Sequence, residues 1–182
     1  MLTVNYILSQ ILVIIAIGLY ALTFLLKTKK NVLIIGLLGV VLNTISFILL
    51  GAYTGALVNV VAIIRSLWFF FEEKKGKRTW ISLTIVMILI MFATIFTYKN
   101  WIDILPFVAG IVYAFACWQK NIPLYRWLGI LVSLIYIVYD VWFSSIFGVV
   151  SELIAILCAI VGLILGLIKK KQMQTNNESK AQ

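Results

Sequence analysis

The sequence contains no histidine, and its two cysteines, Cys117 and Cys158, stand singly inside apolar stretches. Without histidine or a CxxC spacing, the chain lacks the usual ligands of a zinc site and the usual base that activates a nucleophile. Glycine-rich phosphate-binding loops are missing as well. We therefore expect no enzymatic activity, no metal and no cofactor.

Charge is also scarce. Only 12% of the 182 residues are charged, with 15 Lys and Arg against 6 Asp and Glu and a net charge of +9. The basic residues stand at the ends of apolar runs, where membrane topology places them, so the charge does not indicate a nucleic-acid partner. The first of them, Lys27, comes too late for the basic start of a signal peptide, and we expect the first apolar run to be retained.

Apolar sequence is what the chain has in abundance. Hydrophobic residues make up 64% of it, and the mean hydropathy is +1.13, whereas a soluble domain is roughly 45–50% apolar. The apolar runs are continuous, which excludes the alternating pattern of a transmembrane β-barrel. These features predict an all-α membrane protein whose main partner is the lipid bilayer.

Seven runs are long enough to cross a bilayer, which takes about 20 apolar residues. They are residues 6–26, two helices within 31–71 that are separated at Gly51, and residues 79–98, 101–118, 124–143 and 145–168. The last boundary, at Ser144 and Ser145, is the weakest. The polar segment 169–182 is expected to be a disordered basic cytoplasmic tail.

The positions of the basic residues predict an orientation. With seven spans and the N-terminus outside, thirteen of the fifteen Lys and Arg residues fall in inside segments, and only Lys99 falls outside. The remaining one, Arg65, lies within a span. This asymmetry follows the positive-inside rule and predicts a multi-pass protein of the bacterial inner membrane with its C-terminus in the cytoplasm.

An internal repeat is indicated when the chain is shifted by 93 residues against itself. Tyr20-Ala21 then falls on Tyr113-Ala114, and Lys27 falls on Lys120 without a gap. We predict two parallel three-helix repeats, residues 1–71 and 101–168, joined by a cytoplasmic loop and a linker helix within residues 72–100. Parallel repeats with a substrate site at their interface are typical of transporters.

The third helices of the two halves each present one polar residue among small ones. Asn59 and Glu152 occupy matching positions, and their neighbours on the same faces are Gly55, Ala62 and Ser66 in the first half and Gly148, Ala155 and Ala159 in the second. Such a face is either a packing surface or the wall of a pore, and for Asn59 both interpretations stay open. A carboxylate inside a bilayer costs a few kcal/mol unless it is paired, hydrated or protonated, so Glu152 favours a functional role.

Three further polar positions leave alternatives open. Arg65 either extends its charge to the inner interface, pairs with a carboxylate, or binds an anionic group of a substrate. Asp140 either reaches the outer interface or lines the outer half of a cavity together with Asn43 and Tyr136. Gly162 and Gly166 form a GxxxG pattern, a packing or dimer signal that leaves homo-oligomerisation open.

A set of local patterns carries a family resemblance. They are Leu49 to Gly55, Ile64-Arg65, Leu105-Pro106, Tyr136, Asp140-Val141-Trp142, Ser145-Ile146, Gly148 and Glu152. With these residues the chain resembles the YgjV family of bacterial inner-membrane proteins over nearly all seven spans, which implies the location but no substrate. The 3+1+3 plan is also similar to that of the SWEET sugar transporters and the PnuC vitamin-precursor transporters. In SWEETs an asparagine on helix 3 faces another on helix 7; Asn59 matches this role and Glu152 departs from it.

Two functions are compatible with these features. The first is a small-molecule transporter in which the two halves rock around a midplane site for an unknown solute, with Asn43, Asn59, Arg65, Tyr136, Asp140 and Glu152 as candidate binding residues. The second is a non-transporting membrane partner or assembly protein, whose buried polar groups only hold the bundle together.

Overall fold

The computed structural model describes residues 4–49, 53–98, 100–142 and 146–181. Seven α-helices and one short 3-10 helix occupy almost all of this part of the chain: α1 (Val4–Leu25), α2 (Lys29–Leu49), α3 (Tyr53–Lys74), α4 (Trp80–Thr97), η1 (Trp101–Asp103), α5 (Ile104–Trp118), α6 (Ile122–Trp142) and α7 (Ile146–Ala181). No strand occurs within these ranges. The all-α fold and the seven helices are therefore confirmed.

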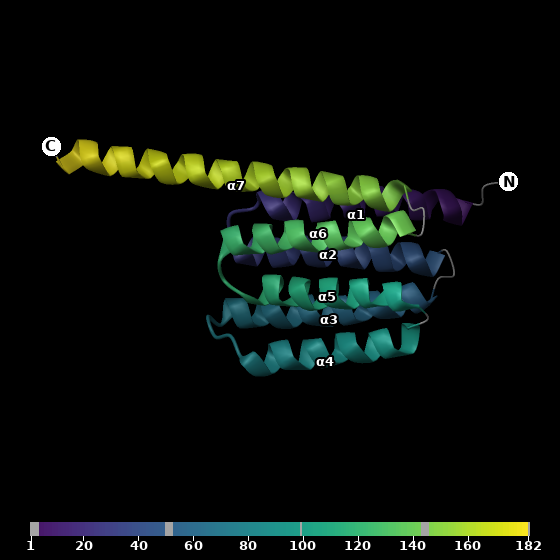
Figure 1. Ribbon diagram of the computed structural model, residues 1–182. Coiled ribbons are helices and arrows are strands. Elements are labelled where there is room, and N and C mark those ends of the chain that lie inside the picture. Colours follow the sequence, from purple (N-terminus) through teal and green to yellow (C-terminus); the bar gives the residue numbers. More distant parts are fainter. Residues whose placement is uncertain (1–3, 50–52, 99, 143–145, 182) are drawn as a thin grey trace.

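Five helices are long and apolar enough to cross a membrane. They are α1, α2 over Lys29–Ser46, the η1–α5 unit over Trp101–Trp118, α6, and α7 over Val149–Lys169. The apolar part of α4, Trp80–Phe96, is shorter, and α3 carries Arg65 in its interior and charged residues at its end. For α3 and α4 the crossing stays a prediction, although both lie alongside the other helices (Figure 1).

Local signals explain where the helices begin and end. Gly76, in the connection from α3 to α4, has a φ of +66°, a conformation that favours glycine. The side chain of Asn121 accepts a hydrogen bond from the backbone N–H of Leu124 at 3.2 Å, which caps the start of α6. Pro123 lies in the first turn of that helix, where its missing N–H removes no intrahelical bond.

The helices form a ring. Neighbours along the chain pack together within α1–α2–α3 and within α5–α6–α7, and the contacts of α1 with α7 and of α3 with α5 close the ring. Helix α4 packs against α3 and α5 (Figure 1). We call the end of the bundle with the α1–α2, α3–α4 and α5–α6 connections the basic end, and the opposite end the far end.

Many of the buried residues of this bundle are small, and many of its large apolar residues are exposed on the outer surface. Ala109, Ala114 and Ala159 are completely buried, whereas Ile14 and Leu157 are more than 60% exposed. A soluble protein buries its large apolar side chains, but in a membrane the lipid covers them, and small residues let helices approach closely.

The C-terminal segment differs from its prediction. Its polarity predicts disorder over residues 169–182, but α7 continues through this segment to Ala181 and projects beyond the basic end (Figure 1). After Gly166 no glycine or proline ends the helix, and Gln, Lys, Glu and Ala favour it. A helix of 36 residues is about 54 Å long, far more than the ~30 Å of a bilayer core.

Some predicted features lie outside the described residues. They include the breaks at Gly51 and at Ser144 and Ser145, the outside residue Lys99, and the side-chain surroundings at Gly55 and Gly148. The helices on either side of both breaks end and begin within two residues of the predicted positions.

Candidate functional site

A cavity of about 650 Å³ lies inside the bundle and is partly open to the surface. All seven helices contribute to its wall, from Ile17 in α1 to Ala155 in α7. Small-molecule sites commonly have volumes of roughly 300–1,000 Å³. We call this space the central cavity, and its size and its polar side chains make it the candidate binding site.

Arg65, on α3, supplies the positive charge of the cavity wall. Its side chain is only 8% exposed, and its guanidinium carbon lies 4.9 Å from the centre of the Tyr113 ring. Within the described part of the chain, its Nε has no hydrogen-bond acceptor, and neither has the Nδ2 of Asn59 on the same helix. Buried donors are almost always paired in proteins, so α3 presents two incomplete donors to the cavity.

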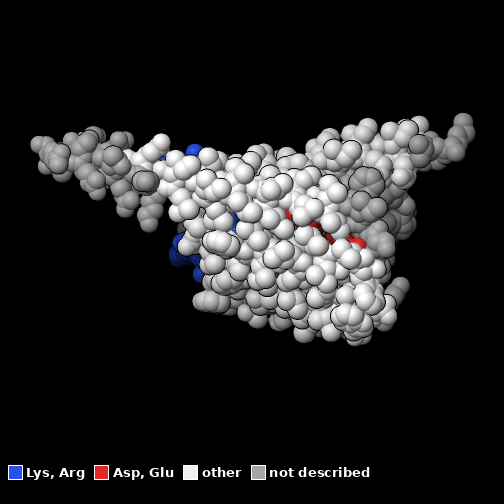
Figure 2. Space-filling model, turned by 45° about the horizontal axis from the view of Figure 1, so that its top comes forward, with Lys and Arg blue, Asp and Glu red and all other residues white. Residues whose placement is uncertain are grey.

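Glu152, on α7, belongs to the acidic part of the same wall. The Ser133 hydroxyl is a hydrogen-bond neighbour of its carboxyl group, and the charge of Asp140 acts on it from α6. Asp103, which accepts a hydrogen bond from the backbone N–H of Asn100 at 2.8 Å, also lines the cavity. Figure 2 shows acidic side chains in a hollow on the surface, away from the Lys and Arg residues of the basic end.

An aromatic floor separates the central cavity from the basic end. The rings of Phe24 and Tyr125 are stacked with their centres 5.3 Å apart. The fully buried Tyr125 places its hydroxyl 2.9 Å from the Thr23 hydroxyl and 3.5 Å from that of Tyr113. A Cβ at Gly129 would lie 2.1 Å from the Phe24 ring, so only glycine allows this ring to cross α6 here.

Below the floor, one arginine joins three helices. Arg126, in the first turns of α6, is 4% exposed. Its guanidinium donates to the carbonyl oxygens of Phe24 at 2.7 Å and Leu26 at 3.1 Å, at the end of α1, and to that of Gly162 on α7 at 2.6 Å. Carbonyls at a helix C-terminus lack intrahelical donors and attract cations. We call this arrangement of Arg126 and its three acceptors the basic-end clamp.

The GxxxG pattern of α7 makes room for this clamp. A Cβ at Gly162 would lie 2.3 Å from the carbonyl oxygen of Phe24 and 2.7 Å from Nε of Arg126. A Cβ at Gly166 would lie 3.3 Å from Nη1 of the same arginine. Within this chain the two glycines therefore serve internal packing against Arg126 and the end of α1.

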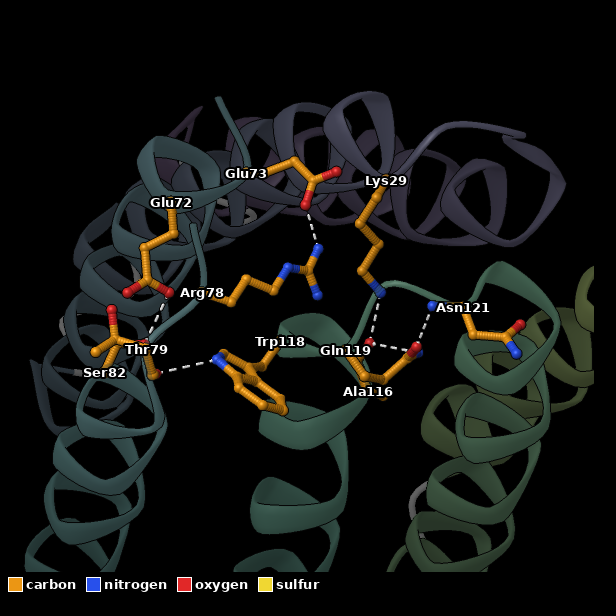
Figure 3. Close-up of polar contacts among 10 residues, drawn as sticks. All are labelled: Lys29, Glu72, Glu73, Arg78, Thr79, Ser82, Ala116, Trp118, Gln119 and Asn121. Carbon is orange, nitrogen blue, oxygen red and sulfur yellow. Dashed lines mark hydrogen bonds and ion pairs between the residues drawn. The ribbon is translucent and has the colours of Figure 1, made fainter. Parts of the chain in front are cut away.

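A second buried cation also bonds to a carbonyl at the end of another helix. Lys29, at the start of α2, is 4% exposed, and its Nζ donates to the carbonyl oxygen of Ala116 in the last turn of α5 (Figure 3). The same Nζ lies 4.2 Å from the centre of the Tyr125 ring. A cation from α6 thus caps α1, and a cation from α2 caps α5.

The connections at the basic end are tied together beside Lys29 (Figure 3). Arg78, in the α3–α4 connection, forms an ion pair with Glu73 in the last turn of α3. The indole N–H of Trp118, the last residue of α5, donates to the carbonyl oxygen of Thr79 at 3.2 Å. These contacts join the α3–α4 connection to the end of α5 and close the bundle on this side.

The structure brings five of the six predicted binding residues to the wall of the central cavity: Asn43, Asn59, Arg65, Tyr136 and Glu152. The sixth, Asp140, does not line the cavity but lies close enough for its charge to act on Tyr136 and Glu152. Asn59 and Glu152 thus face an internal space and not the outer surface of the bundle. That these residues bind a solute stays a prediction.

Twelve lining residues form six pairs that are 93 residues apart. The pairs are Ile17 and Gly110, Tyr20 and Tyr113, Val40 and Ser133, Asn43 and Tyr136, Asn59 and Glu152, and Ala62 and Ala155. The offset is the one on which the predicted repeat is based.

The sequence interpretation missed the roles of Arg126 and Lys29, which it counted only as inside charges. A signal was present for the first: Arg126, Gly129 and Ser133 have i, i+3, i+7 spacing, which places them on one face of a helix. A charge that shares a face with a glycine and a serine indicates an inward direction. The acceptors of both cations are backbone carbonyls of other helices, and no side-chain pattern encodes those.

The comparisons agree with the apolar, all-helical architecture. The chain matches the family model Imp-YgjV, described as bacterial inner membrane protein, over residues 7–171. No curated protein and no solved structure gives a match, so the similarity to SWEET and PnuC transporters stays a prediction. The match covers most of the chain and confirms the resemblance noted in its local patterns. The protein therefore belongs to the Imp-YgjV family and is an integral protein of the bacterial inner membrane.

Proposed function

We propose that the protein is a transporter that carries a small solute through its central cavity. The observation that supports this most directly is the polar wall of the cavity inside an otherwise apolar bundle. A packed membrane bundle does not need an internal space of about 650 Å³, nor two buried donors without acceptors in its described part. Intramembrane polar groups of this kind usually mark a solute or ion pathway.

In this proposal the structure represents a state of the transporter in which the central cavity is closed at the basic end. The aromatic floor, the basic-end clamp and the tied connections all lie between the central cavity and that end, whereas acidic side chains are accessible in a hollow on the surface (Figure 2). The positive-inside rule makes the basic end cytoplasmic and puts the N-terminus outside. Transport would then require the floor and the clamp to separate.

Two observations support a 3+1+3 repeat as the basis of this motion. The six lining pairs place equivalent positions of α1–α2–α3 and α5–α6–α7 around one cavity. Exchange of the two halves also converts the contact between α1 and α7 into the contact between α5 and α3, and both occur. In this proposal the halves rock about α1–α7 and α3–α5, with α4 as the linker.

The alternative is a membrane partner or assembly protein without a solute. The projecting end of α7 beyond the basic end favours it, since an extended helix outside the bundle is available to another protein (Figure 1). In that case the cavity would hold only water, and its polar residues would serve packing.

A binding screen with the purified full-length protein separates the two functions. We expect one solute from a panel of metabolites to raise the unfolding temperature, because a ligand of the native state stabilises it in proportion to ln(1 + [L]/Kd). The same solute should accumulate in proteoliposomes. Glu152→Gln should strongly weaken both effects without changing the unfolding temperature of the free protein, whereas Glu72→Gln, at the basic end and outside the cavity wall, should retain them.

The assembly function would be favoured by the opposite pattern. No metabolite would then raise the unfolding temperature or enter proteoliposomes, and Glu152→Gln would act only by destabilising the bundle. Removal of residues 172–182 would abolish capture of a partner protein while it left the unfolding temperature unchanged.

A further inference from the structure

Arg65 and Glu152 line the central cavity, and among the described residues they do not form an ion pair with each other. Within the residues that the structure describes, the one ion pair is Arg78 with Glu73, at the basic end. Arg65 and Glu152 therefore line the same cavity without an opposite charge bonded to either of them. Opposite charges in a low-dielectric space attract strongly when they meet, so their separation leaves two complementary binding positions.

The positive position is Arg65, which is buried. Among the described residues its Nε finds no hydrogen-bond acceptor, and neither does the amide nitrogen of Asn59. The contact with the Tyr113 ring compensates part of the buried charge but supplies no hydrogen-bond acceptor. A guanidinium has a planar fork of donors that matches a carboxylate.

The negative position is Glu152, with the charges of Asp140 and Asp103 at the same end of the bundle. A simple anion approaching Arg65 from this side would be repelled by these carboxylates. A simple cation would supply no hydrogen-bond acceptor to the guanidinium of Arg65. A molecule that carries both charges satisfies both positions.

The space between the two positions is lined by aromatic and apolar side chains. Tyr136 lines the same cavity and lies near enough to both Glu152 and Arg65 for their charges to act on its phenol. Tyr20 and Tyr113 lie near the guanidinium, and Val132 and Ile90 add apolar wall. Such walls bind apolar or aromatic bodies through their area and their ring faces.

We infer that the central cavity takes a small zwitterion, with its carboxylate on Arg65, its ammonium group at Glu152 and an apolar or aromatic body between the tyrosines. The inference names the substrate class of the proposed transporter. It rests on that proposal only because both concern the same central cavity. The inference concerns binding and needs no transport step.

A set of matched probes tests the charge requirement. Phenylalanine, 3-phenylpropanoate and 2-phenylethylamine share one aromatic body. Phenylalanine carries both charges, 3-phenylpropanoate carries only the carboxylate, and 2-phenylethylamine carries only the ammonium group. 4-Aminobutanoate and 6-aminohexanoate extend the distance between the charges. We expect at least one zwitterion to bind the purified full-length protein at least tenfold more tightly than either singly charged analogue, measured by calorimetry and by the shift of the unfolding temperature.

Two variants assign the ends. In Arg65→Gln the zwitterion should bind no better than the amine, and in Glu152→Gln no better than the acid. Glu72→Gln is the control, because Glu72 lies at the basic end outside the cavity wall and an amide oxygen can still accept the hydrogen bond from Ser82; this variant should retain the preference for the zwitterion. Each variant should still bind one of the two singly charged probes, which an unfolded protein would not do. A lost preference for the zwitterion therefore reports a lost contact and not a loss of folding.

Three results would overturn the inference. Tightest binding of 3-phenylpropanoate, tightest binding of 2-phenylethylamine, or binding of only an uncharged metabolite from the wider panel would each show that the cavity does not require both charges. In all three cases solute binding is retained, so the transporter proposal survives. Only the absence of binding by every probe and metabolite, together with no uptake into proteoliposomes, would remove both proposals.

Discussion

Two buried arginines divide the molecule into a structural and a functional region. Arg126, in the basic-end clamp, directs its guanidinium at three backbone carbonyls at 2.6–3.1 Å. Arg65, in the central cavity, lies over a tyrosine ring and has an Nε that finds no acceptor in the described residues. Both side chains are more than 90% buried, so burial does not distinguish them.

The difference between them is the completeness of their hydrogen bonding. A buried charge is costly unless its hydrogen bonds are satisfied, so a fully satisfied guanidinium can hold helices together. An incompletely satisfied one lowers stability unless something else completes it, and a protein retains it where a ligand does so. The first pattern predicts large losses of stability on mutation, and the second predicts losses of binding.

Arg126→Met should have the largest effect on stability. It removes the side-chain donor of the carbonyls of Phe24 and Leu26 at the end of α1 and breaks the additional bond to the carbonyl of Gly162 within α7. Hydrogen bonds to charged groups are worth about 1.5–3 kcal/mol each. We expect the free energy of unfolding to fall by about 3 kcal/mol or more. Thermal unfolding in detergent, followed by size-exclusion chromatography of the heated sample, measures the change.

The matched control is Lys120→Met, which removes an exposed cation at the same end of the bundle. It should leave the unfolding temperature almost unchanged, because exposed charges contribute little. Equal unfolding temperatures for both variants would show that the clamp does not hold the helices together.

Gly162→Ala should have the next largest effect. Its new Cβ would meet the backbone oxygen of Phe24 at 2.3 Å, and a backbone group cannot rotate away as a side chain does. Overpacking of this kind costs about 1–3 kcal/mol. Gly18→Ala is the control, since beyond the local backbone of its own helix nothing packs within 4 Å of the position that its new methyl group would occupy, and alanine favours a helix. A neutral Gly162→Ala would mean that α7 and α1 can separate at little cost.

Part of this division was predictable from the sequence. Continuous apolar runs predict the membrane class and seven helices, and the matched positions of Asn59 and Glu152 predict inward faces that meet at one cavity. Asp140 shares a helix face with Tyr136 but lies beside the wall and not on it, because the extent of the cavity along α6 depends on the packing of the other helices, which the sequence does not encode. The polarity of residues 169–182 predicts disorder, although the helix-forming residues of this segment carry the opposite signal.

The clamp was not predictable for a different reason. Arg126 and Lys29 bond to carbonyl oxygens at the ends of α1 and α5, and every residue has such an oxygen. Only the packing of the helix ends decides which carbonyls lack donors. Sequence can therefore indicate which charges turn inward, but not which backbone groups receive them.

Lys29→Met should destabilise the protein less than Arg126→Met, by about 1–2 kcal/mol. The carbonyl oxygen of Ala116 that Lys29 bonds also accepts a hydrogen bond from Nε2 of Gln119 at 3.0 Å, so it retains a donor. The contact of the ammonium with the Tyr125 ring is lost as well. Urea unfolding curves of this variant, with the exposed Lys30→Met beside it, would contradict the prediction if the two variants unfolded alike.

Arg65→Met should have the smallest effect on stability, and of the opposite sign. The substitution removes an incompletely bonded charge and fills its place with an apolar chain, and such replacements are often neutral or stabilising by about 1 kcal/mol or more. The lost contact with the Tyr113 ring, worth roughly 0.5–2 kcal/mol, offsets part of this gain. An unfolding temperature at or above that of the unmodified protein, with no response to added zwitterion, is the expected result. A fall as large as that of Arg126→Met would mean that Arg65 also holds the bundle together, and a ligand would then not be needed to explain why the protein retains this charge.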